Sequence, residues 1–163
     1  ANTATVSYQW SEKRVQPLIA CKQSKKERQT FFGAVAIQTG QVVAKRSDRG
    51  NAKTFKSFLL KVLHTFKGKK VLMVLDNVRY HHAKMLKPFL DNNKDKLQLM
   101  FLPPYSPDLN PMERVWWYMR KKITHNRWVV SLTERIKVFW QLFSTFKKPN
   151  PFIQHLCNTN FSV

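Results

Sequence analysis

The stretch "FLPPYSPDLNPMERVWWYMRKKI", residues 101–123, decides how this sequence is interpreted. It begins at the end of an apolar run and passes through a proline-rich turn into a helical pattern. Asn110 stands at the N-cap position, Pro111 at the first helical position and Glu113 at the third, which is the spacing of a capping box. Taken alone, Glu113 is explained as a helix cap and Asp108 as a turn residue.

Charge is the second informative feature. The 163 residues include 29 Lys and Arg but only 9 Asp and Glu, which gives a formal net charge of +20. This balance indicates a polyanionic partner, nucleic acid first and an anionic membrane second. The longest apolar run, Phe31 to Ile37, is too short to span a membrane, and the first residues lack a signal-peptide pattern. We therefore expect one soluble, intracellular domain without a membrane partner.

The order of predicted elements favours an α/β fold. Strands at 15–21, 29–37 and 41–45 form an antiparallel meander with a turn at Thr39-Gly40. Apolar residues then recur at helical spacing behind Asn51. The apolar runs at 69–76 and 97–102 indicate strands buried on both faces, the first of them a parallel central strand. Further helices, which complete a mixed sheet with helices on its faces, are predicted at 83–93, limited by Pro88, at 110–127 and at 131–146.

Four of the nine acidic residues are candidates for function, because the others fall in polar loops or on helix surfaces. The four are Asp48, Asp76, Asp108 and Glu113. Asp76 directly follows "VLMVL", at the carboxyl end of a predicted central strand, where functional groups gather in open sheets. An ion pair with one of the many cations is the alternative to a metal site there. Acting together, Asp76 and Glu113 suit the two-metal chemistry of phosphodiesters, because Mg²⁺ prefers carboxylate oxygens.

Two motifs carry a resemblance to a known family. "VLMVLDNVRYH" contains Asp76 and Asn77 with His81 five positions after the Asp, and Pro103 to Glu113 reads "PPYSPDLNPME". Together they resemble the DDE transposases, specifically the mariner-like group and its bacterial insertion-sequence relatives. Those proteins carry the second motif with Ile where this chain has Met112.

The resemblance implies a fold, an activity and a set of partners. The implied fold is RNase H-like, a mixed five-stranded sheet with an antiparallel meander and then parallel strands, flanked by helices. The implied activity is hydrolysis at transposon ends to free a 3′-hydroxyl, followed by its attack on target DNA, with two Mg²⁺ or Mn²⁺ ions. The partner is double-stranded DNA, transposon ends and target, bound by a homodimer. A bacterial, cytoplasmic and nucleoid-associated protein is implied.

The same resemblance assigns roles to individual residues. Asp76 and Glu113 become catalytic metal ligands, and Asn77, His81 and Asn110 become neighbours that support them. For His81 and His82, a polar pair opening a surface helix is an equal alternative from the sequence alone.

One departure from the family pattern concerns the first acid. The family carries its first Asp on the first strand of the sheet, and no Asp or Glu precedes Glu12 here. We therefore expect residues 1–163 to be a single RNase H-like catalytic domain with a truncated first strand, its first catalytic Asp and the usual helix-turn-helix domain lying outside the chain. Asp48 falls at the wrong topological position to replace that Asp.

Basic residues at two places are candidates for DNA binding. They are Lys25, Lys26, Arg28, Arg120, Lys121 and Lys122. A solvated basic surface is the alternative for each of them. Trp116 is expected in the core and Trp117 on another side of the same helix. The competing hypothesis for the whole chain is a catalytically inactive RNase H-like protein that binds nucleic acid.

Overall fold

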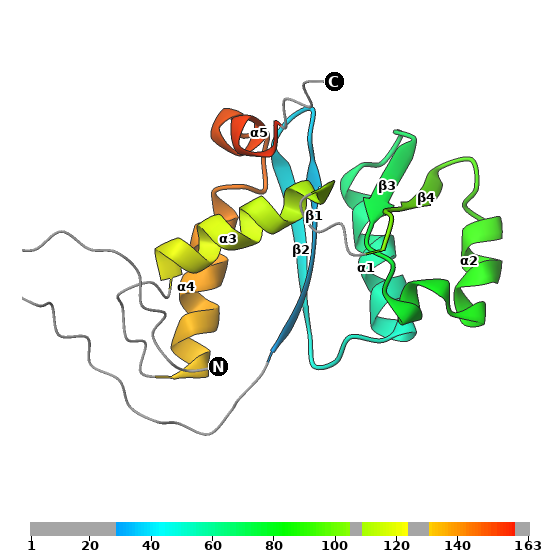
Figure 1. Ribbon diagram of the computed structural model, residues 1–163, viewed down its shortest axis with the longest axis horizontal. Helices are drawn as coiled ribbons and strands as arrows, with labels where there is room; N and C mark the ends of the chain where they lie inside the picture. The colour runs from blue at the N-terminus through cyan, green and yellow to red at the C-terminus, as the bar shows by residue number, and fades with distance from the viewer. Residues whose placement is uncertain (1–28, 105–108, 124–130, 159–163) are drawn as a thin grey trace, which may run out of the picture.

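The computed structural model describes residues 29–104, 109–123 and 131–158, and its centre is an antiparallel hairpin (Figure 1). The hairpin consists of β1 (Thr30–Ala36) and β2 (Gln41–Ser47). Gly40 closes the turn with φ of 69°, and the carbonyl of Asn150 lies where a Cβ of residue 40 would stand. Glycine is therefore required there twice over, for its backbone conformation and for its lack of a side chain.

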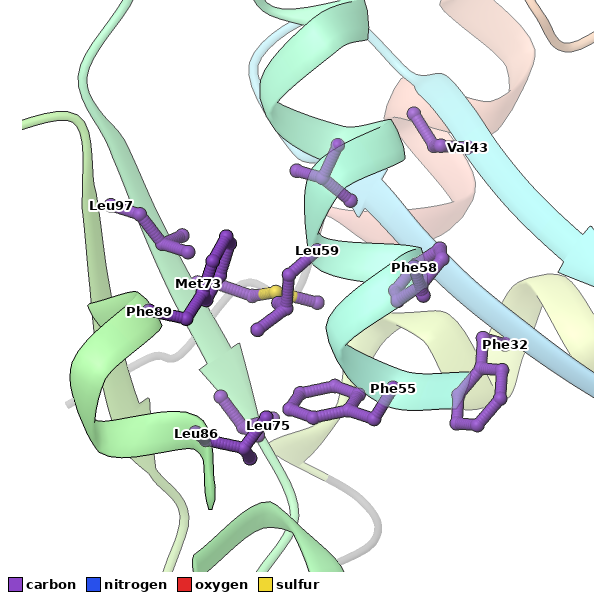
Figure 2. Packing of buried hydrophobic residues seen from close by; sticks show 11 residues of the cluster. Phe32, Val43, Phe55, Phe58, Leu59, Met73, Leu75, Leu86, Phe89 and Leu97 are labelled. Atoms are coloured by element: carbon purple, nitrogen blue, oxygen red, sulfur yellow. The ribbon is translucent and has the colours of Figure 1, made fainter. Parts of the chain in front are cut away.

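Helix α1 (Ala52–Thr65) covers one face of the hairpin. It begins at Asn51, whose side chain accepts a hydrogen bond from the Thr54 N–H at 3.0 Å, while the Thr54 hydroxyl accepts one from the Asn51 N–H at 3.1 Å. This reciprocal pair satisfies two backbone donors that a helix start leaves open. The apolar residues at helical spacing, Phe55, Phe58, Leu59 and Val62, are all buried against the hairpin and the next strand (Figure 2).

Two parallel strands, β3 (Val71–Leu75) and β4 (Leu97–Phe101), form a second sheet on the far side of α1 (Figure 1). Met73, Leu75 and Leu97 point into the cluster around α1. The connection between the strands contains two 3₁₀ turns, Arg79–His82 and Lys84–Leu86, and helix α2 (Lys87–Asp91).

Three helices cover the other face of the hairpin: α3 (Pro111–Ile123), α4 (Leu132–Ser144) and α5 (Pro151–Cys157). Val42 and Ala44 of β2 point into this second cluster, which also buries Val115, Phe143 and Ile153. The connection from α4 to α5 follows the outer edge of β2, where the Val42 N–H donates to the Phe146 carbonyl at 2.8 Å.

The sheet differs from the single five-stranded sheet predicted. Within the described residues, β1 pairs with β2 and β3 with β4, as two separate two-stranded sheets. The predicted antiparallel turn, the parallel pair and the helix behind Asn51 are present, whereas the strand predicted at 15–21 lies outside the described residues. No described helix is long and apolar enough to cross a membrane.

Two further predictions about the elements are wrong, and one helix was not predicted. β3 and β4 are buried on one face only, because Leu72, Val74 and Met100 are exposed. Pro88 lies in the first turn of α2, where its missing N–H costs nothing, so it starts that helix and does not limit it. Helix α5 was not predicted, although Asn150 as N-cap and Pro151 at the first position are a recognisable helix start.

Among the described residues, each sheet has a strand edge without a backbone partner. The outer edge of β2 is occupied, because the Ala44 carbonyl accepts from Lys61 Nζ at 2.9 Å and the Val42 N–H has its partner on Phe146. In the described part of the chain, no backbone group pairs with the second edge of β1 or of β3. The two sheets pack on α1, and the ring of Tyr80, in the 3₁₀ turn after β3, lies 6.2 Å from that of Phe32 on β1.

Gly33 provides the first testable prediction, because α3 lies directly over it. A Cβ at residue 33 would collide with the Trp116 ring and would lie 2.6 Å from Met112 Cε. We expect Gly33→Ala to lower the free energy of unfolding by about 1–3 kcal/mol through overpacking, measured by urea denaturation. Gly50→Ala is the control, because its Cβ would lie 3.6 Å from the nearest atom, on Tyr80. Equal stability of the two variants would contradict this account of the β1–α3 contact.

Candidate metal-binding site at the carboxyl end of β3

Asp76 is the first residue after β3 and its side chain is 59% exposed. The sequence suggested that a carboxylate at the end of a buried strand must be paired or bound to metal to offset its burial. The structure removes that argument, because the carboxylate stands in solvent and suffers little desolvation. The Asp76 carboxylate is therefore available to a ligand from solvent.

His81 contacts Asp76 from the side of the turn that faces α1. Its Nδ1 lies 3.0 Å from the Asp76 backbone carbonyl and 3.3 Å from Asp76 Oδ1. Since a carbonyl oxygen only accepts, Nδ1 carries the proton in this contact. The ring is 7% exposed and stacks on Phe55 of α1 at 4.2 Å, and this burial lowers the pKa of His81. The alternative of a polar residue on a surface helix is therefore wrong for His81, and its role beside a metal ligand stays a prediction.

A second pair repeats the same spacing one residue later. His82 Nε2 is hydrogen bonded to Asn77 Oδ1, and the His82 ring packs on Phe101, the last residue of β4, at 4.2 Å. The sequence left His82 open between scaffolding the site and a polar residue on a surface helix, and "DN" followed five residues later by "HH" carried the signal for this contact. The two histidines thus connect the Asp76-Asn77 turn to α1 and to β4.

Glu113 lies in the first turn of α3, with an exposed side chain. Asn110 is the N-cap, because its Oδ1 accepts from the Met112 N–H at 3.0 Å. In the other half of a capping box, the Asn110 N–H would donate to the Glu113 carboxylate. This hydrogen bond does not occur among the described residues. Capping therefore accounts for Asn110, while the Glu113 carboxylate keeps its oxygens available and favours the positive end of the helix.

Asp76 follows β3, and the chain runs from the end of β4 to α3, which carries Glu113. Leu75 and Phe101 are register partners, and the Leu102 N–H donates to the Leu75 carbonyl at 2.8 Å, so both strands end together. Residues 102–110 lead from that end to α3. In the described part of the chain, no group of three His, Cys, Asp or Glu side chains could hold a metal. Asp76 and Glu113 are each exposed and carry carboxylate oxygens, the donors that Mg²⁺ prefers.

The other predicted residues belong to other elements or lie outside the described residues. Arg120, Lys121 and Lys122 are exposed in the last turns of α3, whereas Lys25, Lys26, Arg28 and Asp108 lie outside the described residues. Asp48 is exposed in the connection between β2 and α1. Cys157 is a buried free thiol, and burial raises its pKa.

With this geometry in view, comparison with known proteins identifies the class. The model of the family described as DDE superfamily endonuclease matches residues 1–134, and the chain therefore belongs to that family. Its curated relatives include the insertion element IS630 uncharacterized 39 kDa protein of Shigella sonnei, 27% identical over 124 residues. An uncharacterized protein of Sinorhizobium fredii, y4pE/y4sA, is 42% identical over 60 residues. The predicted resemblance to DDE proteins of the insertion-sequence type is confirmed.

Solved structures define the fold. The Mos1 transposase paired-end complex with the left transposon end superposes with a TM-score of 0.70 at 15% identity, covering 96% of this chain and 48% of that one. The Mos1 mariner paired-end complex with Mn gives 0.63 at 16% identity, covering 95% and 48%. The chain also spans only 36% and 41% of the two curated relatives. The α/β fold is therefore shared with a region of about half of the Mos1 chain.

The cap of α3 gives the second prediction. Asn110→Ala removes the acceptor for the Met112 N–H, and we expect it to lower the free energy of unfolding by about 1 kcal/mol in urea denaturation. Asn110→Asp is the matched control, since it keeps the acceptor oxygen and should retain nearly all of the stability. A similar loss in both variants would show that Asn110 acts through its amide nitrogen and not as a cap.

Proposed function

We propose that this chain is the catalytic domain of a DNA transposase that hydrolyses phosphodiester bonds at transposon ends and transfers the freed strand into target DNA. The observation that carries the proposal is the Asp76 turn, an exposed carboxylate fixed by a buried histidine at the end of β3. The family match and the shared fold support it.

Asp76 and Glu113 would hold divalent cations, Mg²⁺ or Mn²⁺, for which their exposed oxygens are suitable donors. When bound, a pair of such ions activates the attacking oxygen and stabilises the leaving oxygen of a phosphodiester. His81 would keep the Asp76 carboxylate from rotating away, through its contacts with both the backbone and the side chain. One structural neighbour is a Mos1 mariner paired-end complex with Mn, which supports the choice of metal.

The third ligand would come from an additional strand. β1 and β3 each have one edge without a described backbone partner, and both pack on α1. A strand inserted between them would join the two sheets into one of five strands, RNase H-like, and would pass beside Gly33, which lies under the first turn of α3. We propose that this strand carries the first Asp and, like the helix-turn-helix domain, belongs to the full-length protein outside the described residues.

The partner would be double-stranded DNA, drawn in by the net charge of +20. One structural neighbour, the Mos1 transposase paired-end complex, contains the left transposon end, which supports this choice. Arg120, Lys121 and Lys122 on α3 are the described cations that we assign to the DNA backbone, with Lys25, Lys26 and Arg28 as further contacts. A homodimer on DNA, in the bacterial cytoplasm at the nucleoid, completes the proposal.

The third prediction tests the two carboxylates in the full-length protein, which includes the additional strand. Asp76→Asn and Glu113→Gln should each reduce Mg²⁺- or Mn²⁺-dependent plasmid nicking by at least about 100-fold, because changes to groups that merely support a ligand already cost 10–100-fold. Affinity for DNA, measured without metal by fluorescence anisotropy, should fall little, since neither side chain is a cation.

Asp91→Asn is the control for this experiment, because Asp91 is exposed at the end of α2, away from the turn. It should nick DNA like the parent protein. If nicking persisted in either the Asp76 or the Glu113 variant, the assignment of metal ligands would be wrong. If the parent protein bound DNA but never cut it with either metal, the competing hypothesis of an inactive nucleic-acid-binding protein would replace this one.

A further inference from the structure

One exposed strip of α3 leads away from the proposed metal site. Glu113, Trp117 and Lys121 recur every four residues and therefore lie on one side of the helix, one turn apart. All three are exposed. The opposite side of α3 is buried in the second apolar cluster through Met112, Val115, Met119 and Ile123. The strip is thus the solvent-facing side of a helix that is fixed by its other side.

Trp117 is the unusual member of this strip. Its surface is 49% exposed, although the residue before it, Trp116, supplies the aromatic ring that packs on Gly33 and Phe139. Packing of α3 therefore does not require a second tryptophan. The Lys121 ammonium lies 5.1 Å from the centre of the Trp117 ring, which places a cation against an exposed aromatic surface. Aromatic rings beside cations are the combination with which proteins bind unpaired nucleic-acid strands.

The position of the strip specifies which nucleotide would be bound. Trp117 lies one turn, about 6 Å along the helix axis, beyond Glu113. In B-form DNA the phosphates of one strand are spaced about 3.4 Å apart along the helix axis. A length of about 6 Å therefore corresponds to one or two nucleotides. A base stacked on Trp117 would therefore be close in sequence to the phosphate at the proposed metal site, and Lys121 would meet a phosphate further along.

We propose that the strip Glu113-Trp117-Lys121 binds the DNA strand end at the cleavage site, with an unpaired base stacked on Trp117 and the neighbouring phosphate at Lys121. The reference to the cleavage site rests on the proposed function. A strand end is favoured over intact duplex because an indole ring can stack only on a base face that is not covered by its neighbours. Arg120, exposed on the adjacent side of α3, extends the cationic surface toward the next phosphates.

The test measures binding without metal, so that it does not depend on catalysis. Full-length protein is titrated into a fluorescent single strand of about 12 nucleotides, and separately into the matching duplex, in EDTA. Trp117→Ala should weaken single-strand binding roughly tenfold and duplex binding less than about twofold. Trp117→Phe should recover most of the loss, because it retains a ring on which a base can stack.

Lys121→Met tests the phosphate contact. It should reduce the slope of log Kd against log salt concentration for the single strand by about 0.7, the contribution of one phosphate contact. Phe152→Ala is the control, since Phe152 is also an exposed aromatic, 50% accessible, but belongs to α5 and not to the strip. It should leave both affinities unchanged.

Three results would overturn the proposal: unchanged single-strand binding in Trp117→Ala, an equal loss for single strand and duplex, or the same loss in Phe152→Ala. These outcomes are independent of the nicking assay. If nicking survived Asp76→Asn while single-strand binding still required Trp117, the metal-site assignment would fail and the strand-end site would stand. If nicking required Asp76 but Trp117→Ala bound normally, the reverse would hold.

Discussion

The hairpin of β1 and β2 is buried on both faces, and this constraint organises the rest of the molecule. Successive side chains of a strand point to opposite faces, so Val43 packs with α1 while Val42 and Ala44 pack with the three C-terminal helices. Both apolar clusters therefore depend on the register of one hairpin. A slip of one residue would exchange the two sets, placing large side chains where α3 allows only Gly33.

The apolar cluster around α1 holds the proposed metal site in place. Phe55 belongs to the buried face of α1 and also supports the His81 ring, which in turn holds the Asp76 turn. The exposed carboxylate is thus connected to the core through two stacked rings and a hydrogen bond. Such an arrangement combines two requirements that conflict in most surface loops: the acid remains accessible to solvent and metal, while its backbone is held by buried groups.

Local signals in the sequence were sufficient for many of the described elements and insufficient for their assembly. The turn at Gly40 and the cap at Asn51 depend on neighbouring residues alone, and both formed where predicted. The exposure of Leu72 and Val74 was not predictable, because an apolar run has the same appearance whether one or two faces are covered. Likewise, "DNVRYHH" indicated a candidate site, but only the fold of the 3₁₀ turn showed that one histidine is buried and the other exposed.

The neighbouring tryptophans of α3 show why the solvent-facing side of this helix carries information about function. Two residues in succession lie about 100° apart around a helix, so one can serve the core while the other faces solvent. Trp116 fills the space above Gly33, and its size is explained by packing. No packing requirement explains the size of Trp117, which leaves a large apolar surface in water beside a lysine. In a chain with so high a positive charge, a polyanion with exposed bases is the ligand whose chemistry matches both parts of that surface.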